Sequence, residues 1–192
     1  MKNLQELHSD FCNYSEYIKG NTPDTITWLK AGMELYLKFS RAEYPKDITL
    51  FSLEDWILHG RAKRNWKAKT VHTYLRAVSL FFDWCVTRNH LKTNPAKEIP
   101  RPKLEKKIPK YLTETESDKI LYWARNYPYH YKLESFRNSA IISTFLATGI
   151  RRKELINLKI EDVDLRKGEL YVRQGKGSKD RLIPFRPSLA YI

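Results

Sequence analysis

Apolar side chains recur at spacings of three and four through the first 90 residues, which is the periodicity of amphipathic helices. The predicted helices cover residues 4–18, 24–41, 52–58 and 69–89. Gly20 and Pro23 lie between the first two, and Ser52, with acidic residues after it, is the expected cap of the third. We expect the aromatic side chains of these helices to form the core of a helical domain rather than a ligand site.

The pattern changes after residue 94. Four prolines fall between residues 95 and 110, within a run rich in lysine, and such a run cannot make a packed element. Thr113 and Glu116 have the spacing of a capping box, which starts helical structure again. The chain is therefore expected to contain a helical domain (1–100), a basic proline-rich linker (101–112) and a second domain (113–192).

The second domain is expected to mix helix and strand. An apolar helix over 140–146 ends at Thr148 and Gly149, and an amphipathic run follows it. Two short β-like runs, at 169–173 and 181–185, flank a turn that contains glycine and lysine. The predicted fold class is mainly α: a helical domain is followed by the start of an α+β domain with a small antiparallel sheet.

Composition narrows the class of protein. A hydrophobic content of 42% is enough for one or two modest cores. Cys12 and Cys85 have no CxxC spacing, so we expect a reducing compartment and no structural zinc. The sequence shows no signal peptide at its start and no apolar run of membrane-spanning length. These features predict a cytoplasmic protein with no membrane partner.

Charge is concentrated in the middle of the chain. The net charge is +13, and residues 61–110 carry 14 Lys and Arg against 3 Asp and Glu. Such a concentration favours a nucleic acid as partner, because lysine and arginine neutralise phosphates. The start of the 69–89 helix combines an apolar stripe with basic and hydroxyl side chains on the opposite face. A helix of this kind can dock in the major groove of DNA. The predicted DNA-binding residues here are Arg64, Lys67, Lys69, Thr70, His72, Thr73, Arg76, Arg101 and Lys103.

A solvated basic surface is the alternative for these residues, since charged helix faces usually contact only water. A P-loop is excluded at Gly175-Lys176, because no glycine stands five residues earlier and neither Ser nor Thr follows the lysine. A metal centre is not expected either, because the five histidines are scattered and are not grouped with carboxylates.

A series of short motifs then identifies a family. They are a helix at 70–84 ending in Phe-Phe-Asp-Trp, Asn94-Pro95-Ala96, Pro100-Arg101-Pro102-Lys103, Tyr111-Leu112-Thr113, Arg137-Asn138-Ser139-Ala140, Ala147-Thr148-Gly149-Ile150-Arg151 with Glu154-Leu155, and the hairpin Gly175-Lys176-Gly177-x-Lys179-x-Arg181. Each alone is common. In this order and spacing, nearly the whole chain resembles a tyrosine recombinase of the phage integrase family with a Xer-type layout, in which a core-binding (SAM-like) domain precedes the catalytic domain.

The resemblance implies roles for three residues of the second domain. Arg151 matches the first catalytic arginine, whose planar guanidinium can neutralise charge on the scissile phosphate. Glu154 matches the acidic residue that supports it, and Lys176 matches the hairpin lysine that acts as general acid. Arg152 is a weaker alternative to Arg151. Lys179 and Arg181 are expected to be phosphate contacts rather than catalytic groups, and no cofactor or metal is implied.

The family also requires a second group of residues that this sequence lacks. That group has a histidine and an arginine three positions apart, a further histidine or tryptophan, and a tyrosine nucleophile. All five histidines precede Arg151, while Tyr171 falls on a strand and Tyr191 falls where the next helix would begin. We therefore expect a recombinase truncated after the first half of its catalytic domain, which binds duplex DNA without cutting it.

Two classes of function remain open. The chain is either part of a site-specific recombinase, whose full-length form would act as a multimer on DNA, or a truncated DNA-binding competitor or regulator without enzymatic activity. An unrelated helical DNA-binding regulator is a third, weaker alternative. Double-stranded DNA is the expected partner in each case, and no small-molecule substrate is expected.

Overall fold

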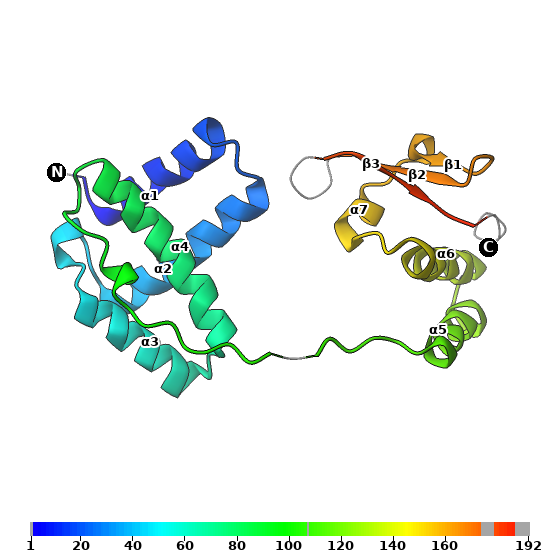
Figure 1. The fold of residues 1–192 in the computed structure, drawn as a ribbon, viewed down its shortest axis with the longest axis horizontal. Helices are drawn as coiled ribbons and strands as arrows, with labels where there is room; N and C mark the ends of the chain where they lie inside the picture. The colour runs from blue at the N-terminus through cyan, green and yellow to red at the C-terminus, as the bar shows by residue number, and fades with distance from the viewer. Residues whose placement is uncertain (1, 107, 174–178, 187–192) are drawn as a thin grey trace. The chain divides into compact units, whose positions relative to one another are not determined.

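A computed structural model describes residues 2–106, 108–173 and 179–186. The chain divides into two compact units, residues 1–107 and residues 108–192. Figure 1 shows the first as a group of helices and the second as helices with a small sheet. Each unit is described by itself below.

Among the described residues of unit 1, all the regular secondary structure is helical. Its elements are α1 (Leu4–Asn13), a π-helical turn (Tyr14–Ile18), α2 (Pro23–Ser40), a 3-10 turn (Pro45–Asp47), α3 (Leu50–Arg64), α4 (Ala68–Thr87) and a second 3-10 turn (Pro95–Lys97). Asn3 caps α1 in a capping box with Glu6, and Pro23 occupies the first position of α2, where its missing N–H costs nothing. These helices agree with the predicted ones except at α3.

The core of unit 1 lies where α2 crosses α4. A Cβ atom placed on Gly32 of α2 would meet the Cβ of Ala77 on α4 at 2.6 Å, so the glycine permits this close approach. Around the crossing, Met33, Phe81 and Phe82 are fully buried. The aromatic side chains therefore form core, as the apolar periodicity predicts.

The prediction for α3 was wrong in two respects. Thr49, not Ser52, caps the helix by accepting a hydrogen bond from the Ser52 N–H. The helix also continues to Arg64, beyond the predicted end at residue 58, and its last turn holds Arg61, Lys63 and Arg64. Trp66 provides the physical reason, because its indole ring lies so close to Gly60 that a Cβ there would be 2.1 Å from it. This contact fixes the sharp exit from α3.

Asn94 anchors the segment that follows α4 to this helix through side-chain hydrogen bonds. Its amide donates to the carbonyl oxygen of Ser79 at 3.0 Å and to the Asp83 carboxylate at 3.0 Å. Beyond the 3-10 turn at Pro95–Lys97, residues 100–106 and 108–113 have neither helix nor strand. The prolines in this segment account for that, since each removes a backbone donor and fixes φ.

Unit 2 contains α5 (Glu114–Asn126), α6 (Lys132–Thr148), α7 (Arg152–Ile156), a 3-10 turn (Ile160–Asp162) and strands β1 (Val163–Asp164), β2 (Glu169–Val172) and β3 (Arg181–Pro184). Thr113 and Glu116 form the predicted capping box at α5, and α5 packs on α6. The sheet is antiparallel with the order β1-β2-β3, and Val172 pairs with Arg181. The two-residue strand β1 was not predicted, because periodicity cannot identify so short an element.

The architecture is mainly α with one small antiparallel sheet, which confirms the predicted fold class. Among the described residues, no helix combines the length and the apolar character needed to cross a membrane.

Candidate functional site

The junction between α6 and α7 presents Arg151. Gly149 ends α6 with φ of +61°, a left-handed conformation in which glycine avoids the strain of a side chain. Ile150 is buried, and Arg151 then takes an extended conformation as the N-cap of α7. The Arg151 side chain therefore projects from the surface at the N-terminal end of α7, and 57% of its area is exposed.

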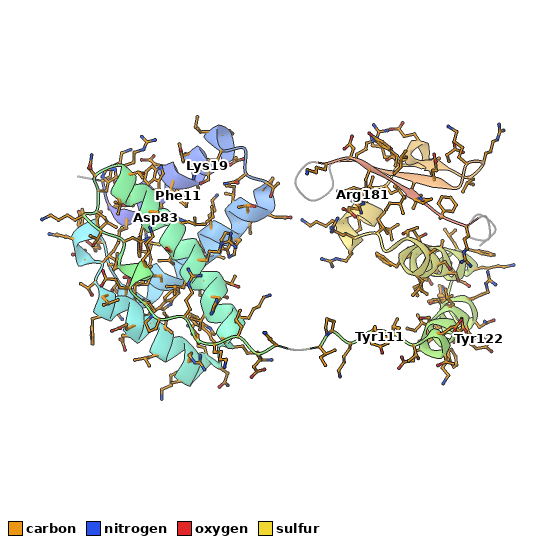
Figure 2. The ribbon with its side chains drawn as sticks, in the orientation of Figure 1. Phe11, Lys19, Asp83, Tyr111, Tyr122 and Arg181 are labelled. Atoms are coloured by element: carbon orange, nitrogen blue, oxygen red, sulfur yellow. The ribbon has the colours of Figure 1, made fainter. Side chains whose placement is uncertain are left out.

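Glu154 lies beneath this arginine, and only 8% of its side chain is exposed. Oε1 accepts hydrogen bonds from Nη1 of Arg151 and Nη1 of Arg181, both at 2.9 Å. Oε2 accepts from the backbone N–H of Arg151 at 2.9 Å and from Nη2 of Arg181 at 2.7 Å. One buried carboxylate thus joins the α6–α7 junction to β3, and in Figure 2 Arg181 lies beside α7.

The two arginines keep Glu154 ionised. The bidentate hydrogen bonds from Arg181 are the main cause that lowers the pKa of Glu154 to about 2, with a further contribution from Arg151, while desolvation acts in the opposite direction. Because the pKa is depressed on folding, the ion pair stabilises the fold fully above the ordinary carboxyl pKa. This stabilisation is lost as the pH falls toward 2.

We expect Glu154→Gln to destabilise unit 2 in a pH-dependent manner. At pH 7 the loss should be about 2 kcal/mol, because two partly exposed arginines are screened by solvent. The difference between variant and wild type should shrink as the pH falls from about 4.5 to 2, where wild-type Glu154 is itself protonated. Thermal unfolding followed at several pH values measures this difference. A difference that stays constant over this range would contradict the proposed ionisation.

The hairpin between β2 and β3 carries the other residues predicted in this region. Lys176 lies outside the described residues. Lys179 is exposed, and the hydroxyl of Tyr171 on β2 donates to the Asp180 carboxylate at 2.7 Å. Arg181 was predicted as a phosphate contact, but both of its terminal nitrogens donate to Glu154. The structure thus brings Arg151, Glu154 and Arg181 together.

Unit 1 carries the other predicted DNA-binding residues at the corner between α3 and α4. Arg64 is exposed at the end of α3, and Lys67 is the exposed N-cap of α4. Along α4, Lys69, Thr73 and Arg76 are exposed and Thr70 is half-buried. The Thr73 hydroxyl donates to the Lys69 carbonyl oxygen, and the Arg76 guanidinium lies 6.0 Å from the Trp28 ring.

His72, which the sequence predicts as a DNA-binding residue, contacts the linker in this structure. Its Nε2 is 2.8 Å from the carbonyl oxygen of Pro102, and because a carbonyl oxygen can only accept, Nε2 donates this hydrogen bond to the linker. Arg101 and Lys103, on either side of Pro102, are exposed. The histidine therefore holds the start of the linker against α4.

We expect His72→Ala to free this part of the linker. The lost hydrogen bond should raise the rate of tryptic cleavage after Lys103 about fivefold, which corresponds to roughly 1 kcal/mol. Cleavage after Lys110 provides the reference within the same chain, because that exposed lysine lies beyond the contact. Mass spectrometry of the fragments gives the ratio of the two rates, and an unchanged ratio would exclude the anchoring role.

Sequence reasoning missed the position of Arg181 because 27 residues separate it from Glu154 and no local pattern links them. It also missed a polar pocket of about 490 Å³ next to this site, between α7 and the sheet. Arg173 lines the pocket and donates to Asp162 at 2.6 Å. Among the described residues, no group of three or more His, Cys, Asp or Glu side chains could hold a metal ion.

Comparison with known proteins places these features in a family. The model of the phage integrase family matches residues 110–192. Tyrosine recombinase XerC of Thermodesulfovibrio yellowstonii is 30% identical over 187 residues, which are 96% of this chain and 59% of that protein. XerC of Shigella flexneri is 30% identical over 203 residues, which cover 98% of this chain and 63% of the relative. The chain belongs to the phage integrase family of tyrosine recombinases.

This tyrosine recombinase chain spans about three fifths of the length of the XerC proteins it matches. A lambda integrase dimer bound to a COC′ core site has the same fold, with a TM-score of 0.74 at 21% identity, over 95% of this chain and 62% of the integrase. The segment that matches the phage integrase family contains Arg151, Glu154 and Arg181.

Proposed function

We propose that this chain binds duplex DNA as part of site-specific recombination, with Arg151 contacting the phosphate at which a strand is exchanged. The observation that carries this proposal is the exposed Arg151 guanidinium, which is paired with the buried carboxylate of Glu154. Membership of the tyrosine recombinase family supports the reaction class. The lambda integrase dimer of the same fold is bound to its core site, which supports DNA as the partner.

The chemistry of phosphoryl transfer explains why an arginine is needed at this position. Negative charge grows on the non-bridging oxygens as the attacking and leaving oxygens share one phosphorus. A guanidinium with a fixed orientation stabilises that charge through two parallel hydrogen bonds. Glu154 supplies the orientation, and we assign Lys176 the role of proton donor to the leaving oxygen, as its resemblance to the family implies.

We propose that these 192 residues do not supply every group that strand cleavage needs. A tyrosine nucleophile must meet two arginines and a histidine at the same phosphate, and no histidine follows Arg151 in this sequence. We propose that the chain by itself binds DNA without forming a covalent intermediate. With the remaining part of the relatives' length, the protein would act as a multimer on its recombination site.

Unit 1 would supply most of the affinity for DNA. Lys67, Lys69 and Arg76 occupy the exposed side of α4 near its start, and Arg64 precedes them at the end of α3. Arg101 and Lys103 extend the basic surface along the anchored part of the linker. Lysine and arginine in such a row bind phosphates of either strand and release counterions.

Fluorescence anisotropy with a labelled duplex tests the binding. The logarithm of the association constant should fall with the logarithm of salt concentration, with a slope of about −0.9 for each phosphate neutralised and about −5 in total. A slope near zero would exclude DNA as the partner. A nicked suicide duplex tests the second part of the proposal, because a covalent protein–DNA adduct formed by this chain would overturn it.

A further inference from the structure

We propose that Arg181 is a positioning residue for Arg151. By occupying both oxygens of Glu154, it prevents Arg151 from forming a bidentate pair with the same carboxylate and so keeps one edge of the Arg151 guanidinium open to a phosphate. The inference rests on the proposed function, in which Arg151 contacts DNA. It replaces the sequence-based expectation that Arg181 touches a phosphate itself.

The hydrogen bonds around Glu154 carry the argument. An ionised carboxylate offers about four lone-pair sites, two on each oxygen. In this structure four donors fill them: Nη1 of Arg151 and Nη1 of Arg181 on Oε1, and the backbone N–H of Arg151 and Nη2 of Arg181 on Oε2. The carboxylate is therefore saturated, and a second side-chain bond from Arg151 has no acceptor site.

Saturation determines what the rest of the Arg151 side chain can do. Among the described residues, no hydrogen bond occupies its Nε or Nη2, and 57% of the side chain is exposed. These two donors lie on one edge of a planar group and match the spacing of two phosphate oxygens. Arg151 thus uses one terminal nitrogen for orientation and keeps a two-donor edge for its ligand.

Arg181 is held more firmly than Arg151. It is the first residue of β3, its backbone pairs with Val172, and its side chain is 35% exposed. If its guanidinium is removed, two of the four sites on Glu154 become vacant. Arg151 is then free to take them, because a bidentate Arg–carboxylate pair is the favoured geometry. That pair would withdraw from the phosphate the donors that bind it.

A double-mutant cycle on DNA affinity tests this proposal. We expect Arg151→Ala to weaken binding of a labelled duplex about tenfold, as loss of a charge-assisted contact does. Arg181→Ala should cost nearly the same in the wild-type background and almost nothing in the Arg151→Ala background. If Arg181 instead contacts a phosphate directly, the two losses will multiply, and the salt slope of the double variant will fall by a further 0.9 or so.

Arg173→Ala is the matched control. It removes the same charge from the residue that follows β2, but Arg173 pairs with Asp162 and Glu161 rather than with Glu154. Its effect on affinity should therefore multiply with that of Arg151→Ala. If the losses of affinity caused by Arg173→Ala and Arg151→Ala also fail to multiply, a general loss of charge or of folding, and not positioning, explains the result for Arg181.

NMR of the arginine side chains separates this proposal from the proposed function. In the DNA-free chain, Arg181→Ala should shift the Arg151 guanidinium signals and slow the exchange of its N–H protons with water, because the group closes onto Glu154. Arg181→Lys, whose single ammonium cannot make two parallel bonds, should show the same change more weakly if the alanine variant is unfolded. Unchanged Arg151 signals in a folded variant would overturn the positioning role. If Arg151→Ala leaves the affinity for DNA unchanged while substitutions of other residues lower it, the proposed contact between Arg151 and a phosphate is overturned instead.

Discussion

Replacing Lys67, Lys69 and Arg76 together by glutamate lowers the affinity for duplex DNA by about a thousandfold. Each of the three side chains is exposed, at the N-cap or in the first half of α4, and loss of one phosphate contact costs roughly a factor of ten. The salt slope should become shallower by about 2.7, because three phosphates are no longer neutralised. Fluorescence anisotropy titrations at several salt concentrations measure both quantities.

The matched control reverses Lys19, Lys30 and Lys46 instead. These lysines are exposed on unit 1 but lie outside the basic segment of residues 61–110. The change in net charge is the same, so its effect through long-range attraction is the same, and we expect a loss below tenfold. Equal losses for the two triple variants would mean that α4 is not the DNA-binding surface.

The second large effect is expected in the core of unit 1. Trp56→Ala should lower the free energy of unfolding of this unit by about 4 kcal/mol, as removal of a large buried aromatic side chain does. Trp56 is 2% exposed, and its ring packs against Tyr36, Trp66 and Tyr74. Because Trp66 also fixes the exit from α3, the corner that presents Arg64 and the start of α4 should lose order, and DNA binding should fall with it.

Urea unfolding followed by tryptophan fluorescence measures this effect. Four of the five tryptophans are in unit 1, so the signal reports mainly on that unit. Leu58→Ala is the control, since Leu58 lies on the same helix with 65% exposure and should change stability by less than about 0.5 kcal/mol. A Trp56 variant as stable as the Leu58 variant would show that the aromatic cluster does not support unit 1.

Local rules were enough to predict most of the fold. Apolar residues at helical spacing located α1, α2 and α4, and the capping box at Thr113 located the start of α5. α3 was predicted too short because its apolar residues do not form one clear stripe. Its observed end lies where Trp66 packs on Gly60, a contact made only after the chain has turned, and no local pattern shows it.

The candidate site was predictable in its residues but not in its connections. The motif around Arg151 identified the arginine and Glu154 through resemblance to the family. The partnership of Glu154 with Arg181 joins a helix junction to a strand, and the bond from His72 to Pro102 joins a helix to a linker. Such contacts depend on tertiary structure, so sequence patterns could not predict the partners of Arg181 and His72, both of which were predicted as DNA contacts.

The close crossing of α2 and α4 at Gly32 and Ala77 also limits the length of DNA that the basic residues of α4 can contact. A helix fixed at its middle moves as one body, so Lys69 and Arg76 stay about 10 Å apart along its axis. At about 3.4 Å per base pair, that distance spans the phosphates of about three base pairs. Because phosphate contacts fix the position of a protein on DNA without reading the bases, selection of a unique site would have to come from other side chains or from several copies on one stretch of DNA.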